Sequence, residues 1–112
     1  MKIKVFLFPD YIHLDSMKFR SLTLWRILQE QGVELEEKHW NGTLDSLPKG
    51  EPVLVRLSSM MLHSQAELVR FCEESGHLLF YEERILCPTP AFTPEEIGEA
   101  LNNWLKKNKF IQ

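Results

Sequence analysis

Short runs of apolar residues alternate along this chain with stretches in which apolar residues recur every three or four positions. The runs are IKVFLF (3–8), PVLVRL (52–57) and HLLFYEE (77–83). Runs of this length are typical of buried strands, and the helical spacing is typical of helices that cover a sheet. This alternation predicts an α/β domain with a small, mainly parallel sheet flanked by helices.

The predicted sheet has four strands, because VELEEKHW (33–40) alternates apolar with charged residues as a half-exposed edge strand does. Connections between parallel strands are nearly always right-handed, which favours the strand order 2-1-3-4 of flavodoxin-like and Rossmann-like folds. Two details stay open. Residues 43–48 are compatible with a short turn of helix, and RILC (84–87) is compatible with an extra antiparallel edge strand.

A first helix is expected over residues 14–32. Asp15 or Ser16 can serve as its N-cap, and Gly32 is a natural C-terminal stop. Its apolar residues lie on one broad face: Leu22, Leu24, Trp25, Ile27 and Leu28.

Two further helices begin with capping boxes, in which a Ser or Thr and a Glu three positions later satisfy backbone N–H groups reciprocally. The pairs are Ser64 with Glu67 and Thr93 with Glu96. Gly76 ends the second helix, and a proline occupies the first position of the third. The apolar stripe of the third helix comprises Ile97, Leu101, Trp104 and Leu105.

A chain of 112 residues has room for one hydrophobic core, so a single domain over residues 1–112 is expected. The core should contain the apolar residues of the strands and the aromatic residues of the helices. The predicted core residues are Phe6, Phe8, Trp25, Val53, Val55, Leu57, Leu79, Leu101 and Trp104.

Charge and composition exclude several classes of protein. The net charge of -3 and the pI near 5.8 give no general attraction to DNA or to an anionic membrane. The first apolar run stops at Pro9 and Asp10, too early for a signal peptide or a membrane span. Two cysteines, Cys72 and Cys87, do not make a disulfide framework. A cytoplasmic location is therefore expected.

Motifs of the common site chemistries are missing from the sequence. It contains no G-x-G-x-x-G, no P-loop, no C-x-x-C, no H-E-x-x-H and no G-x-S-x-G. The four histidines, at positions 13, 39, 63 and 77, lack the close spacing of metal ligands. His39 and His77 stand at strand ends and are interpreted as incidental. Neither a cofactor nor a metal is expected.

The segment CPTP (87–90) is similar to the C-P-x-P motif of small sulfur-carrier proteins, and residues 87–105 resemble the last turn and helix of response-regulator receiver domains. Both resemblances are short, and the chain departs from each pattern. In the sulfur carriers the cysteine leads directly into the first helix, whereas AFT intervenes here. Receiver domains have a lysine at the position of Cys87 and an aspartate where this chain has Leu57 and Ser58. Neither activity is expected.

Polar residues gather where the first and third predicted strands end. In open α/β sheets, ligands bind beyond the carboxyl ends of the strands, where neighbouring connections leave in opposite directions. With the order 2-1-3-4, this crevice lies between the first and third strands. The candidate ligand-binding rim comprises Asp10, Tyr11, His13, Ser58, Ser59, His63 and, after the fourth strand, Glu82.

Cys87 is predicted to be a structural residue at a corner of the chain. Pro88 and Pro90 restrict the backbone on its far side, so CPTP is preorganised as an extended turn. A reactive thiol would need an electropositive setting, and only Arg84 is close in sequence. Any chemistry is therefore expected at the rim.

Two functions are compatible with these features. The first is a small interaction or regulatory module without its own catalysis, which would contact a protein partner or form a homodimer through the edge strand 33–40, with Trp40 at its end, or through the first helix. The second is a ligand-binding domain or enzyme for a nucleotide-like or other anionic ligand. In that case His13 and His63 could contact phosphate or act as general acid and base. The missing catalytic motifs favour the first function.

Overall fold

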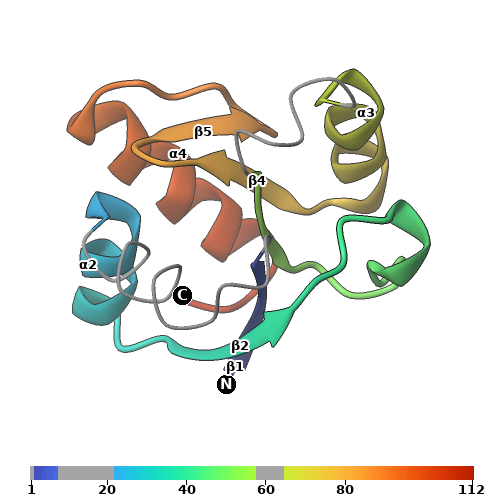
Figure 1. Cartoon of the computed structure of the whole chain (residues 1–112). Helices are drawn as coiled ribbons and strands as arrows, with labels where there is room; N and C mark the ends of the chain where they lie inside the picture. The colour runs from blue at the N-terminus through green and yellow to red at the C-terminus, as the bar shows by residue number, and fades with distance from the viewer. Residues whose placement is uncertain (1, 8–21, 58–64) are drawn as a thin grey trace.

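The computed structural model describes residues 2–7, 22–57 and 65–112, and these residues form an α/β fold (Figure 1). Its strands are β1 (Lys2–Leu7), β2 (Glu34–His39), β3 (Leu54–Arg56), β4 (Leu78–Tyr81) and β5 (Arg84–Cys87). Its helices are α2 (Thr23–Glu30), α3 (Gln65–Ser75) and α4 (Pro94–Lys107), with a 3₁₀ turn, η1, at Leu44–Ser46. Residues 43–48 therefore contain the short turn of helix with which their sequence is compatible.

The strands form one mixed sheet in the order β2-β1-β3-β4-β5. The first four strands have the expected order, and the pairs β1–β2, β1–β3 and β3–β4 are parallel. Strand β5 pairs with β4 in the antiparallel direction. The prediction of a mainly parallel, four-stranded sheet is wrong in this respect, and the alternative with an extra edge strand at 84–87 is confirmed.

A two-residue turn explains the antiparallel pair. Only Glu82 and Glu83 separate β4 from β5, and so short a connection can join antiparallel strands but not parallel ones. Glu82 has a φ of 50°, a conformation that glycine or asparagine adopts more readily. The dipeptide Glu-Glu carries none of the usual hairpin signals, so the local sequence does not decide between the two alternatives.

One face of the sheet is covered by α2 and α4 (Figure 1). We call the apolar cluster on this face the α2/α4 core. The sheet contributes Ile3, Val5, Leu7, Leu54, Leu78, Phe80 and Ile85 to it. The helices contribute Leu24, Leu28, Ile97, Ala100, Leu101, Trp104 and Leu105.

The other face is covered by α3 and by the segment between β2 and β3. We call this cluster the α3 core, and it comprises Trp40, Leu47, Val53, Val55, Leu57, Leu68, Cys72, Leu79 and Cys87. Strand β3 supplies alternate residues to the two cores, as a strand covered on both faces must. All of its residues are buried, which confirms the prediction of a central strand.

The predicted core is largely correct. Six of its members are at most 2% exposed: Val53, Val55, Leu57, Leu79, Leu101 and Trp104. Phe6 and Trp25 are only partly buried and pack at the margins of the two cores, so full burial is wrong for them. Trp25 follows the buried Leu24, and one residue along a helix turns a side chain by about 100° away from the sheet. Phe8 lies outside the described residues.

Helix α2 begins at Thr23, and not at Asp15 or Ser16 as predicted. The preceding residue, Leu22, has an extended backbone (φ -77°, ψ 151°), and its side chain makes no cap. Asp15 and Ser16 lie outside the described residues. The other end of the helix is as expected, because Gly32 follows it with a φ of 71°.

The signals at the other helix ends are confirmed wherever the structure describes them. The Thr93 hydroxyl accepts the backbone N–H of Glu96 at 3.2 Å, and the Glu96 carboxylate accepts that of Thr93 at 3.1 Å. Gly76 follows α3 with a φ of 77°, whereas the predicted cap at Ser64 lies outside the described residues. Within the described ranges, no helix combines the length and the apolar character needed to cross a membrane.

Trp104 should anchor α4 to the sheet. Its side chain is 2% exposed, and its Nε1–H donates to the carbonyl oxygen of Gly76 at 2.9 Å. We expect Trp104→Ala to lower the free energy of unfolding by about 3–5 kcal/mol, the range for truncating a buried aromatic side chain. Trp104→Phe keeps most of the apolar contacts and should cost about 1–2 kcal/mol. Urea unfolding measures both changes, and a loss below about 1 kcal/mol for Trp104→Ala would contradict this docking of α4.

Candidate functional site

The sheet brings the carboxyl ends of β1 and β3 side by side. Phe6 pairs with Val55, so the two strands leave the sheet at the same edge. Strand β2 neighbours β1, and β4 neighbours β3, so the chain continues from this edge in opposite directions. This is the switch-point arrangement at which open α/β sheets bind ligands.

Most of the predicted rim falls outside the described residues, so its role stays a prediction. This applies to Asp10, Tyr11, His13, Ser58, Ser59 and His63. Glu82 is described, and it lies exposed in the β4–β5 turn together with Glu83. Because β4 runs parallel to β3, this turn lies at the same edge of the sheet, one strand away from the switch point.

A buried arginine at this edge was not predicted. Arg56 is the last residue of β3, and only 6% of its surface is exposed. Side chains alternate along a strand, so Arg56 lies on the same face as Leu54, which packs in the α2/α4 core. A guanidinium is costly to remove from water and is seldom buried unless an anionic or hydrogen-bonding group faces it. The signal in the sequence is the lone charge near the end of the apolar run PVLVRL.

A carboxylate from the β4–β5 turn caps helix α2. The backbone N–H of Thr23 donates to both carboxylate oxygens of Glu83, at 2.9 Å and 3.3 Å. The first turn of α2 has no acidic residue of its own, so Glu83 supplies the negative charge that stabilises a helix N-terminus. A contact between residues this far apart explains why the start of α2 was placed wrongly from local sequence.

A shallow hollow adjoins this cap. It is lined by Leu24, Ile85, Ile97 and residues 82–84. It encloses no space for even a water molecule, so it is not a ligand pocket. The hollow lies where the β4–β5 hairpin packs against α2 and α4.

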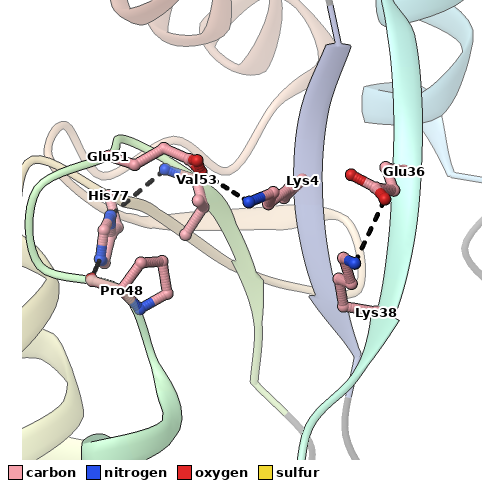
Figure 2. A network of polar contacts seen from close by, with 7 residues as sticks. All are labelled: Lys4, Glu36, Lys38, Pro48, Glu51, Val53 and His77. Atoms are coloured by element: carbon pink, nitrogen blue, oxygen red, sulfur yellow. Dashed lines mark hydrogen bonds and ion pairs between the residues drawn. The ribbon is translucent and has the colours of Figure 1, made fainter.

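A fully buried histidine lies at the opposite end of the strands, where β3 and β4 begin (Figure 2). The Nδ1 atom of His77 accepts the backbone N–H of Val53 at 3.2 Å, and its Nε2 atom lies 2.7 Å from the carbonyl oxygen of Pro48. A neutral ring with its proton on Nε2 satisfies both contacts. His77 therefore links the segment between β2 and β3 to the start of β4. This role is structural, and the interpretation of His77 as incidental to function stays a prediction.

Burial lowers the pKa of His77 below its ordinary value, because the charged ring would lose its water. The carbonyl of Pro48 and the carboxylate of Glu51 oppose this shift but are the smaller effects. Figure 2 shows Glu51 turned toward Lys4, whose Nζ lies 3.1 Å from Glu51 Oε1. A proton added at Nδ1 would face the N–H of Val53, so protonation breaks the hydrogen bond between His77 and Val53.

The two cysteines meet in the α3 core. Cys72, on α3, and Cys87, at the end of β5, are free thiols with no exposed surface. The Cys87 thiol donates to the carbonyl oxygen of His77 at 3.5 Å. Cys87 is the last residue of β5, and the chain bends directly after it at Pro88 and Thr89. Its lack of chemistry stays a prediction.

Within the part of the chain that the structure describes, no three His, Cys, Asp or Glu side chains are grouped so that they could hold a metal ion. No protein-family model, no curated protein and no solved structure matches this chain. The function is therefore inferred from the geometry of the molecule itself.

Acid should destabilise the protein through His77. A histidine whose pKa is lowered by folding binds fewer protons in the folded state than in the unfolded chain, so stability falls as the pH falls. The loss begins near the unfolded value of about 6.5 and continues down to the lowered pKa of the folded state. Between pH 6.5 and pH 5.5 we expect a loss of up to about 1 kcal/mol.

Urea unfolding at several pH values measures this loss, with His77→Gln as the control. Glutamine keeps a neutral hydrogen-bonding side chain but does not titrate. The variant should be less stable than the wild type at pH 7, and its stability should change less between pH 6.5 and pH 5.5. An equally steep dependence in the variant would assign the loss to other groups.

Substitutions at the two glutamates of the hairpin should change the free energy of unfolding in opposite directions. Glu83→Gln weakens the charged cap of α2 and should lower the free energy of unfolding by about 0.5–1 kcal/mol. Glu82→Gly places glycine at a positive φ and should raise it by about 0.5–1 kcal/mol. Denaturant unfolding at low salt measures both. A stabilising Glu83→Gln, or a destabilising Glu82→Gly, would contradict the corresponding assignment.

Proposed function

We propose that this protein is a small binding domain for an anionic ligand, nucleotide-like or another phosphate or carboxylate, at the carboxyl ends of β1 and β3. The proposal includes a flavodoxin-like or Rossmann-like single domain, in which this crevice is the usual ligand site. The observation that carries it is Arg56, a buried guanidinium at the end of the central strand beside the switch point.

Burial makes an arginine a strong anion-binding group. Few water molecules compete for its N–H groups, and their planar fork matches two oxygens of a carboxylate or phosphate. The net charge of -3 gives the molecule no general attraction for anions, so a local cation has to supply the affinity. In this proposal His13 and His63 add imidazole donors that work near neutral pH.

The second candidate is an interaction module that binds a protein partner or forms a homodimer. Its support is β2, which is an edge strand of the described sheet and could pair with a strand of another chain. The Trp40 ring itself is not available to a partner, because it is 2% exposed and donates its Nε1–H to the Thr43 carbonyl oxygen at 2.7 Å. On the described surface, Phe92 is the one large apolar side chain that is exposed. A single side chain does not make an apolar docking patch, so ligand binding comes first.

A cytoplasmic location belongs to the same proposal. The two cysteines are free thiols, and free thiols persist in a reducing compartment. Their burial in the α3 core is consistent with a protein that does not rely on a disulfide for its stability.

Thermal unfolding of the full chain with nucleotides, sugar phosphates and dicarboxylates, each with and without Mg²⁺, tests ligand binding. A ligand at about 100 times its Kd should stabilise the protein by about 2.7 kcal/mol. This shift should disappear in Arg56→Gln. It should persist in Arg70→Gln, which removes an exposed arginine from α3.

Two more variants keep the test decisive if Arg56→Gln does not fold. Arg56→Lys retains the charge without the planar fork and should weaken binding about tenfold or more. His63→Ala should weaken the same ligand. No shift with any of the three ligand classes, or equal shifts in the wild type and Arg56→Lys, would contradict the proposed site. A stable dimer in light scattering without any ligand shift would favour the interaction module.

A further inference from the structure

Two thiols from separate elements lie against each other on the face of the sheet opposite α2 and α4. Cys72 belongs to α3, and Cys87 is the last residue of β5. Both are fully buried members of the α3 core. His77 connects them: its backbone N–H donates to the Cys72 carbonyl oxygen at 2.9 Å, and its own carbonyl oxygen accepts the Cys87 thiol at 3.5 Å. Neither residue belongs to the proposed ligand site.

The two thiols differ in how readily they lose a proton. The Cys87 thiol donates to the carbonyl oxygen of His77 at 3.5 Å, and the neighbouring Cys72 thiol and the backbone of Leu79 both favour the ionised form of Cys87. The S–H of Cys72 lowers the pKa of Cys87 in spite of its burial. The same contact, together with burial, raises the pKa of Cys72. Cys87 is therefore the thiol that ionises first, and Cys72 is the neutral partner beside it.

We propose that Cys72 and Cys87 form a reversible disulfide on exposure to a hydroperoxide, which links α3 to the edge strand β5. The Cys87 thiolate attacks one oxygen of the hydroperoxide; an S–O bond forms, the O–O bond breaks, and the other oxygen leaves as water or an alcohol. The Cys72 sulfur then attacks the Cys87 sulfenic acid, and the S–S bond replaces the S–O bond as water leaves. The two thiols lose two hydrogens, and the hydroperoxide gains them.

Opening of β5 gives the oxidant access to this pair. Strand β5 lies at the edge of the sheet, and its outer side is held by backbone hydrogen bonds between Ile85 and Ala91, both 2.9 Å long. Edge elements open locally at a lower free energy than the centre of a sheet. Because only the small open population reacts, oxidation is slower than that of an exposed thiol, and its rate also depends on the reactivity of the thiol that is attacked.

Intact-mass measurement of the reduced full chain after treatment with hydrogen peroxide tests the proposal. We expect a loss of two hydrogen atoms per chain, a cross-linked peptide pair that contains Cys72 and Cys87, and complete reversal by dithiothreitol. The oxidised protein should also have a Tm about 10 °C higher, because the cross-link restricts the unfolded chain.

Single variants assign the order of the steps. Cys72→Ser should stop at a sulfenic acid on Cys87, which dimedone traps, whereas Cys87→Ser should react at least about tenfold more slowly. Cross-links between chains, oxygen adducts without an internal link in the wild type, or a link that forms only in urea would each overturn the proposal. The mass readout involves no ligand, so its result is separate from the test of the proposed function.

Discussion

The burial of β3 on both faces is the constraint on which the rest of the structure depends. Val55 faces the α3 core, and Leu54 faces the α2/α4 core. A strand buried in this way has to lie inside the sheet, with a strand on each side and a helical layer over each face. Once β1 and β4 occupy its two sides, the outer position of β2 makes the chain reverse its direction between β1 and β3. The switch point is thus a consequence of where the apolar residues of β3 have to be.

The two ends of this sheet hold buried polar groups of different character. At the amino end, both ring nitrogens of His77 are engaged by backbone groups of Val53 and Pro48. That imidazole has no nitrogen left for a ligand, and its role is to hold a connecting segment against β4. At the carboxyl end, Arg56 stands where the connecting segments of α/β proteins usually carry function. Buried hydrogen bonds of His77 therefore stabilise the amino end of the sheet, and ligand binding is proposed at the carboxyl end.

The sequence predicts those parts of the fold that neighbouring residues decide. The apolar runs correspond to β1, β3 and β4, and the capping box of Thr93 and Glu96 marks the start of α4. The errors occur where distant contacts decide. Helix α2 starts where Glu83 meets Thr23, and the hairpin at Glu82 has no glycine to signal it. No pattern within a short window contains this information.

The position of the candidate site was easier to predict than its residues. Strand order follows from the handedness of parallel connections, so the end of the sheet at which the switch point lies could be inferred. Arg56 was missed because a charge at the end of a strand is ordinarily exposed to solvent. His77 was missed because its partners are backbone groups, which side-chain patterns do not reveal. The contact between Cys72 and Cys87 depends on the pairing of β5, which the sequence left undecided.

The cap that Glu83 places on α2 has a consequence for the order in which the chain folds. Thr23 and Glu83 are 60 residues apart, and the ribosome completes α2 long before the capping carboxylate emerges. A helix of eight residues is marginal in water without help from other parts of the protein. Its apolar face packs against α4, which follows every other described helix in the chain and is therefore synthesised after them. We therefore expect α2 to become ordered late, only after the hairpin and α4 have been synthesised and have folded.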